Sequence, residues 1–277
     1  MPVAEPVVDQ GEQLTGGGDL GDVRAAALVA ADQLAGADAA LAADATAKNR
    51  GDSGRRVWRA GDHHVHSEYS GDFDTSVNPP RFQKGADAVY PIVTNAIMAK
   101  HFGLSWAMCT DHGGPTHSKV NLELAYPDLL RSRTLVPEVL QFWGMEFDTP
   151  AQDHHTLMIP RHDGEAEQLF ELESLFAEND HFPADPARNN QARMIEFLTI
   201  AKGMRHKPLV IGHHTSRSAP GLGVYGQDTP REFCNGNNVA PDIYVGFEGA
   251  PGHQAAPLIG GKRGACGNYP TRAATTR

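Results

Sequence analysis

The sequence has few cysteines and an excess of acidic over basic residues. Its three cysteines, Cys109, Cys234 and Cys266, form no CxxC pair, which argues against a thiolate zinc site and against a disulfide framework. Lysine and arginine number 24 against 34 aspartates and glutamates, giving a formal net charge of −10. This balance disfavours an extended nucleic-acid-binding surface, which needs clustered Lys and Arg, but bound divalent metals would still permit a small anionic substrate.

The sequence also lacks segments that would direct the chain to a membrane. The first residues have neither the basic nor the apolar region of a signal peptide, and no apolar run approaches the ~20 residues that span a bilayer. We therefore expect a cytoplasmic protein without membrane contact. The 277 residues, 40% hydrophobic and 21% charged, suffice for one large α/β domain or two small ones.

Two regions differ in composition. Residues 1–57 contain a GGG triplet, an alanine-rich run and a polar linker, which predict a peripheral arm with one or two helices. Residues 58–277 alternate short apolar runs with longer segments of helical periodicity, a pattern typical of an α/β domain with a largely parallel sheet or barrel. Strands are predicted at 105–110, 139–147, 155–159, 208–212 and 242–247, and helices at 89–102, 121–135, 165–178 and 191–206.

Histidines and an acidic residue lie at the ends of these predicted strands. His64 and His66 form an HVH triplet, and because residues two apart on a strand face the same side, both imidazoles can bind one metal. His112 follows one apolar run, Glu146 ends another and His213 follows a third. The carboxyl ends of parallel strands form the active sites of α/β barrels, and imidazole with carboxylate suits divalent metals. The pattern predicts a metal-dependent active site.

Other histidines neighbour these candidates. His155 precedes its apolar run, so it is expected to reach the site from a loop or from a strand of opposite direction. His63, His154 and His214 each stand beside a candidate ligand and are expected to support the ligands rather than bind metal. Asp111 is expected to orient a neighbouring imidazole.

The order of these motifs resembles the PHP (polymerase and histidinol phosphatase) metallophosphoesterases over about residues 58–250. DHHVHSEYSGD at residues 62–72 is similar to the opening motif of that family, and TDH, GxE, a histidine and GH follow in the family's order. The resemblance implies a distorted (β/α)7 TIM-like barrel with two or three divalent metals, Zn, Mn or Fe, at one mouth. It also implies hydrolysis of a small phosphorylated substrate.

The resemblance assigns roles to individual residues. The implied metal ligands are His64, His66, Asp72, His112, Glu146, His155 and His213. Asp72 stands one residue beyond the usual position of the family's acid, which Gly71 occupies here. Glu146 would bridge two metals and hold the nucleophilic water, and Arg217 is predicted to bind a phosphoryl group through paired hydrogen bonds.

One motif of the family is missing. A D-x-H pair closes the family's site on the last barrel strand, and none follows FEGAPGHQ at residues 247–254. We therefore expect a chain truncated before its last strand, and two alternatives to the phosphoesterase stay open. One is a catalytically inactive metal-binding fragment or scaffold. The other is an amidohydrolase-type metal hydrolase, which also opens with HxH, although Glu146 and TDH favour the phosphoesterase.

Overall fold

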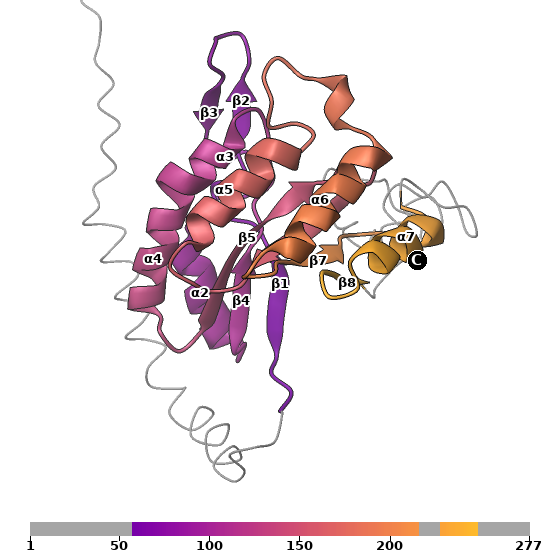
Figure 1. The fold of residues 1–277 in the computed structure, drawn as a ribbon. Helices are drawn as coiled ribbons and strands as arrows, with labels where there is room; N and C mark the ends of the chain where they lie inside the picture. Colours follow the sequence, from indigo (N-terminus) through magenta and orange to yellow (C-terminus); the bar gives the residue numbers. More distant parts are fainter. Residues whose placement is uncertain (1–56, 216–227, 249–277) are drawn as a thin grey trace, which may run out of the picture. The chain divides into compact units, whose positions relative to one another are not determined.

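A computed structural model describes residues 57–215 and 228–248, so Arg217 and nearly all of the arm predicted over residues 1–57 lie outside the described residues. Six strands form one sheet in the order β1-β4-β5-β6-β7-β8, and the sheet curls into a half-barrel (Figure 1). These strands are β1 (Gly61–Val65), β4 (Trp106–Cys109), β5 (Leu140–Asp148), β6 (His154–Ile159), β7 (Leu209–Gly212) and β8 (Tyr244–Phe247). Strands β2 (Asp72–Asp74) and β3 (Arg81–Gln83) form a separate antiparallel hairpin.

Five of the six strands in this sheet run in the same direction, in agreement with the predicted largely parallel sheet, and β6 is the exception. β1, β4 and β5 are parallel, and so are β7 and β8, whereas β6 is antiparallel to both β5 and β7. Residues 149–153 alone connect β5 to β6, and a parallel crossover needs a dozen residues or more. The described residues therefore form a mixed α/β fold with a half-barrel sheet.

The four predicted helices are confirmed, with small differences at their ends. They are α2 (Ile92–His101), a π-helical turn (Asn121–Ala125) that continues as α4 (Tyr126–Leu135), α5 (Glu165–Phe176) and α6 (Gln191–Gly203). Three further helical elements were not predicted: α3 (His117–Val120), a 3-10 turn (Pro186–Arg188) and α7 (Pro230–Val239). The sequence does contain the capping box of α7, in which Thr229 and Glu232 bond each other's backbone. None of the helices in the described ranges has the length and apolar character needed to cross a membrane.

Apolar and polar side chains alternate along β5, so one face of the strand belongs to the hydrophobic core and the other is polar. Trp143, Met145 and Phe147 are buried in the core that the helices cover, and the ring of Phe147 lies 5.0 Å from that of Phe197 on α6. Because successive side chains of a strand point to opposite faces, Glu146 lies on the other side of the sheet. The helices α5 and α6 lie side by side over the core (Figure 1). The opposite face of β5 is thus left for polar groups.

Close pairing of β5 with β6 predicts the effect of a substitution at Gly144. A Cβ there would lie 2.1 Å from the carbonyl oxygen of Leu157 and 2.1 Å from Cε of Met108. The contact with backbone cannot be relieved by a change of rotamer, so Gly144→Ala should lower the free energy of unfolding by about 1–3 kcal/mol. Gly246→Ala on β8 is the control, because nothing lies within 4 Å of the added carbon. Chemical denaturation measures both, and equal losses would contradict the pairing.

Candidate metal centre

Glu146 lies at the centre of a group of six histidines. Its side chain is fully buried, and its two carboxylate oxygens face different imidazoles. Oε1 lies 2.9 Å from Nδ1 of His154, 3.2 Å from Nδ1 of His213 and 2.6 Å from Nε2 of His214. Oε2 lies 3.3 Å from Nε2 of His64, 3.2 Å from Nε2 of His66 and 3.3 Å from Nδ1 of His112.

The ends of four strands bring these imidazoles to Glu146 on β5. His64 lies on β1 and His66 directly follows it, whereas His154 begins the antiparallel strand β6. His112 follows β4 and pairs with Glu146 through an isolated parallel bridge. His213 and His214 follow β7; the φ of His214 is +24°, a value that non-glycine residues rarely adopt. Backbone strain of this kind gathers at functional sites.

Two of the imidazoles are held from behind by carboxylates. Nδ1 of His64 lies 2.7 Å from Oε1 of Glu248, and Nε2 of His154 lies 3.1 Å from Oδ1 of Asp148. Because an ionised carboxylate only accepts hydrogen bonds, each of these outer nitrogens carries a proton. Metal-binding histidines in proteins commonly have such a partner on the nitrogen that does not bind the metal.

A serine hydroxyl holds His66 in the same way. Oγ of Ser70 donates to Oδ1 of Asp111 at 3.2 Å and accepts from the backbone N–H of His112 at 2.9 Å. Its remaining lone pair therefore accepts from Nδ1–H of His66 at 2.8 Å. Nε2 of His66, which faces Glu146, is left without this proton. Asp111 thus acts on His66 through Ser70.

A threonine hydroxyl holds His213. Oγ1 of Thr156 donates to the backbone carbonyl of His63 at 3.3 Å, so it accepts from Nε2–H of His213. Nδ1 of His213 is then unprotonated and faces Glu146. Among the described residues, Nδ1 of His213 and Nδ1 of His214 have no hydrogen-bond partner, although the two residues are only 0% and 4% exposed.

The donor set fits divalent metal ions. Buried nitrogens without hydrogen-bond partners need another explanation, and a metal ligand is one. In four groups the ligand atoms lie within 4.8 Å of one another. The groups are His64 with Glu146, His213 and His214; His66 with His112 and Glu146; His63 with His213 and Glu248; and Asp153 with His154 and His214. Imidazole nitrogen with carboxylate oxygen suits several first-row divalent metals.

Carboxylates determine where the metal-free site holds protons. Burial opposes the protonation of His64, but its hydrogen bonds with Glu146 and Glu248 raise its pKa to about 9. Burial also opposes the protonation of His154, and here Asp148 and Glu146 raise the pKa to about 11. Burial would raise the pKa of Glu146, yet its hydrogen bonds with histidines hold that pKa well below the usual range. Burial lowers the pKa of His213 to about 3.

Five of the seven predicted ligands meet at this centre: His64, His66, His112, Glu146 and His213. Asp72 does not; it is exposed at the start of β2. A different carboxylate, Asp87 in the loop before α2, approaches instead. Its Oδ2 lies 3.7 Å from Nδ1 of His66 and 3.8 Å from Nε2 of His112.

The structure places His154, rather than His155, beside Glu146. In the pairing of β5 with β6, His155 lies opposite Phe147 and His154 lies opposite Asp148. Directly paired residues share a face of the sheet, so His155 belongs to the core face. Its Nε2 lies 2.6 Å from the hydroxyl of Tyr244, and burial lowers its pKa to about 4.

The sequence contains signals for the positions of His155 and Glu248, which the motif order did not predict. His155 shares the two-residue period of the apolar Leu157 and Ile159, which identifies its face as the core face. Glu248 directly follows the apolar end of β8, as His213 follows the end of β7. No comparable signal marks His214, whose approach depends on its unusual φ.

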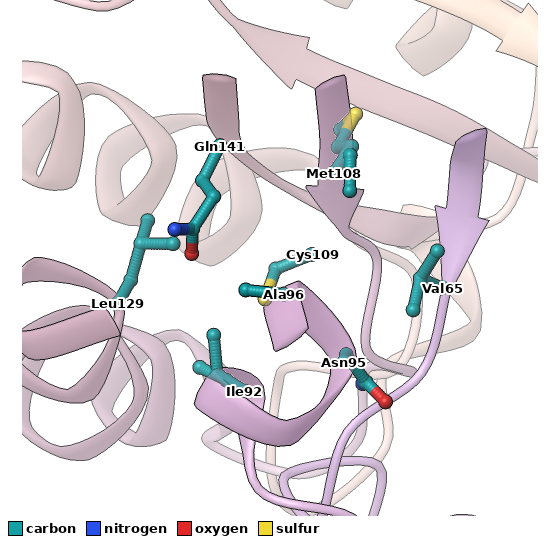
Figure 2. Close-up of a pocket in the computed structure, with 9 residues that line it drawn as sticks. Val65, Ile92, Asn95, Ala96, Met108, Cys109, Leu129 and Gln141 are labelled. Carbon is teal, nitrogen blue, oxygen red and sulfur yellow. The ribbon is translucent and has the colours of Figure 1, made fainter. Parts of the chain in front are cut away.

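A small cavity beside the sheet has no room for a substrate. Figure 2 shows it between the helices α2 and α4 and the strands β1, β4 and β5, with apolar side chains from Ile92, Ala96, Cys109 and Leu129. Its volume is about 20 Å³, which is room for about one water molecule. Asn95 lines it and donates to the backbone carbonyl of His66 at 2.8 Å. This space therefore belongs to the packing that supports the site.

Comparisons of the chain with protein-family models, with curated proteins and with solved structures give no match. The resemblance to the PHP family therefore stays a prediction from the order of motifs. The function has to be inferred from the site itself.

The register of β6 predicts different results for its two neighbouring histidines. His154→Ala removes an imidazole that contacts Glu146 and should weaken metal binding by about tenfold or more. His155→Ala should leave metal affinity unchanged and lower the free energy of unfolding by about 1–3 kcal/mol, because the buried hydroxyl of Tyr244 loses its hydrogen bond with Nε2 of His155 and keeps only the one to Gln152. Elemental analysis and denaturation measure both effects. Loss of metal in His155→Ala alone would contradict this register.

The proton on His64 predicts a pH dependence of the metal-free protein. Its pKa is raised from 6.5 to about 9 in the folded state. The proton therefore stabilises the fold fully below pH 6.5, and this stabilisation is lost as the pH rises through 9. Unfolding of the metal-free protein between pH 6.5 and 9 should show this loss, and His64→Gln should reduce it. The same slope in both proteins would contradict the assignment.

Proposed function

We propose that the chain is a metal-dependent phosphoesterase that hydrolyses a phosphate monoester with an activated water. One observation carries the proposal: each oxygen of the buried Glu146 carboxylate faces its own group of three imidazoles. A carboxylate in this position can bridge two neighbouring metal ions, and paired metals are typical of phosphatases. Zn, Mn and Fe all suit this donor set.

When bound, such metals supply a Lewis acid that polarises phosphoryl oxygens and activates water at neutral pH. The chain's own residues position the site. Glu248 and Asp148 hold the outer nitrogens of His64 and His154, and Thr156 holds that of His213, so that the inner nitrogens face Glu146. Rigid outer partners of this kind fix the ring orientation and the tautomer of metal-binding histidines.

The charge of the site favours an anionic substrate only when metals are bound. Within the described ranges, every ion pair that Glu146, Asp148 and Glu248 make is with a histidine. Positive charge for a phosphoryl group would therefore come from the metals and from Arg217, whose predicted role falls outside the described residues. A small phosphorylated substrate is the class that this arrangement suits best.

We further propose that the half-barrel is part of a distorted TIM-like barrel of the PHP type. Its support is the chain order of the groups around Glu146, which follows HxH, TDH, GxE, a histidine and GH. The same observation disfavours the amidohydrolase-type alternative, because a glutamate of the GxE motif occupies the central position. The inactive metal-binding fragment is distinguished from the enzyme by experiment.

The proposal predicts that Glu146→Gln abolishes hydrolysis. The purified 277-residue chain is analysed for metal content and assayed with p-nitrophenyl phosphate in the presence of Zn2+ or Mn2+. Wild type should bind metal and hydrolyse the ester, and Glu146→Gln should lose both properties because the amide cannot bridge two cations.

Glu173→Gln is the matched control. Glu173 is also fully buried and bonded to a histidine, with its Oε1 2.8 Å from Nδ1 of His117, but it lies outside the metal centre. It should retain metal and activity. Bound metal without turnover in wild type would favour the inactive metal-binding alternative, and a folded wild-type protein without metal would overturn the proposal.

A further inference from the structure

The hydroxyl of Thr156 on β6 lies between histidines that come from two other strands. Its Oγ1 lies 3.3 Å from the carbonyl oxygen of His63 on β1 and 3.0 Å from Nδ1 of the His63 ring. It also bonds Nε2 of His213, which directly follows β7. Thr156 is fully buried, so these groups rather than solvent have to satisfy its hydroxyl.

The contacts between Thr156 and His63 cross the inside of the half-barrel. In the sheet, β4 and β5 separate β1 from β6, so β1 and β6 are not neighbouring strands. A side chain of β6 can bond a residue of β1 only because the sheet curls. The hydroxyl of Thr156 therefore fixes how closely β1, which carries His64, approaches the pair of strands β6 and β7.

His63 points into the half-barrel together with His64 because β1 is irregular. On a regular strand, His63 and His64 would face opposite sides of the sheet. The register of β1 against β4 shifts between Asp62 and Val65, however, and such bulges re-aim side chains. As a result, the rings of His63 and His64 lie 5.8 Å and 3.7 Å from the ring of His213, both on the side of the metal centre.

The three partners of the Thr156 hydroxyl determine where the protons lie. A hydroxyl has one proton and two lone pairs, and the carbonyl oxygen of His63 can only accept, so the proton of Thr156 points to this oxygen. Both ring nitrogens then donate, and Nδ1 of His63 and Nε2 of His213 carry protons. This leaves Nδ1 of His213 unprotonated, 3.2 Å from Oε1 of Glu146. One hydroxyl thus sets the tautomers of two imidazoles.

Glu248 makes a comparable connection between β1 and β8, the two edge strands of the sheet. It follows β8, its Oε1 lies 2.7 Å from Nδ1 of His64, and its Oε2 accepts a hydrogen bond from the backbone N–H of His214. Its backbone N–H donates to the carbonyl oxygen of Gly212 at 2.8 Å. Side-chain bonds from Thr156 and Glu248 thus connect β1 to the strands at the other side of the half-barrel. Loss of one of these connections should weaken the centre without unfolding the chain.

We propose that Thr156 is a positioning residue of the metal centre, whose hydroxyl connects β1 to β6 and β7 and holds His213 in its metal-binding tautomer. Thr156 acts through His63 and His213 rather than by touching a metal. The proposal rests on the proposed function, because the tautomer of His213 matters to the reaction only where Nδ1 of this ring binds a metal.

The same arrangement gives His63 the supporting role expected from its sequence position. Its carbonyl oxygen and its Nδ1 both bond one hydroxyl, so its backbone and its ring are fixed together. Because His63 directly precedes His64, this also fixes the end of β1 that carries the HVH triplet. Outer partners of this kind orient metal-binding histidines.

The variants Thr156→Val and Thr156→Ser separate the hydroxyl from packing. Valine keeps the shape of the side chain without the hydroxyl, whereas serine keeps the hydroxyl without the methyl group. Proton–nitrogen NMR spectra of the metal-free protein show which nitrogen of His213 is protonated, and competition with a chelator gives the affinity for Zn2+. Wild type and Thr156→Ser should carry the proton on Nε2 of His213. Thr156→Val should lose this preference and bind zinc about 10–100-fold more weakly.

The matched control is Thr149→Val. Thr149 is also buried, and its Oγ1 donates to the carbonyl oxygen of Phe147 at 3.0 Å and lies 2.9 Å from Nδ1 of His155, which belongs to the core face. The hydroxyl chemistry is thus the same, but the histidine is one that does not face Glu146. Thr149→Val should bind zinc as tightly as wild type.

The outcomes distinguish this proposal from the proposed function. If wild type binds zinc and folded Thr156→Val binds it with the same affinity, the positioning role is overturned and the proposed function stands. A proton on Nδ1 of His213 in metal-free wild type would also overturn the positioning role, whether or not the variants fold. If wild type binds no zinc, the proposed function fails, and an unchanged His213 tautomer in Thr156→Val would remove the positioning role as well.

Discussion

Burial of the Glu146 carboxylate constrains everything around it. An uncompensated carboxylate in the interior costs several kcal/mol, so the charge must be matched by groups close to it. The match comes from six imidazoles at the ends of β1, β4, β6 and β7, and only a curled sheet brings four strand ends to one side chain. In the metal-free protein, protons on His64 and His154 contribute to this match. The curl of the sheet and the composition of the site are thus two aspects of one electrostatic requirement.

The alternation of side chains between the two faces of β5 and β6 links this site to the hydrophobic core. On β5, Phe147 packs against α6 while the neighbouring Glu146 faces the imidazoles, so one strand holds both the core and the centre in place. β6 continues the division, because its pairing puts His155 with the core and Thr156 with the site. A slip of one residue between β5 and β6 would exchange the two faces. Core packing therefore fixes the positions of the metal-facing atoms.

The strand ends could be predicted from the sequence because apolar runs followed by histidine or glutamate are a local signal. His112, Glu146 and His213 carry it, His64 and His66 are marked instead by their HVH spacing, and the structure brings all five together. Placing His154 in the site would have needed two observations together. Leu157 and Ile159 put every second residue of β6, including His155, on the core face, and β6 runs opposite to its neighbours. The inward turn of His63 depends on an irregularity of β1, and that of His214 on a positive φ. Neither has a signal in side-chain identity, because both are properties of the backbone in its tertiary setting.

Charge explains why so many imidazoles surround so few acids. With every imidazole neutral, Glu146, Asp148 and Glu248 would leave the centre negative, and a phosphate ester would be repelled from it. Protonated imidazoles remove that charge but also remove the lone pairs that bind metal. Divalent cations resolve the conflict, since they neutralise the carboxylates and use the lone pairs at the same time. The outer partners Ser70, Thr156 and Asp148 favour this state, because each occupies the nitrogen that points away from Glu146.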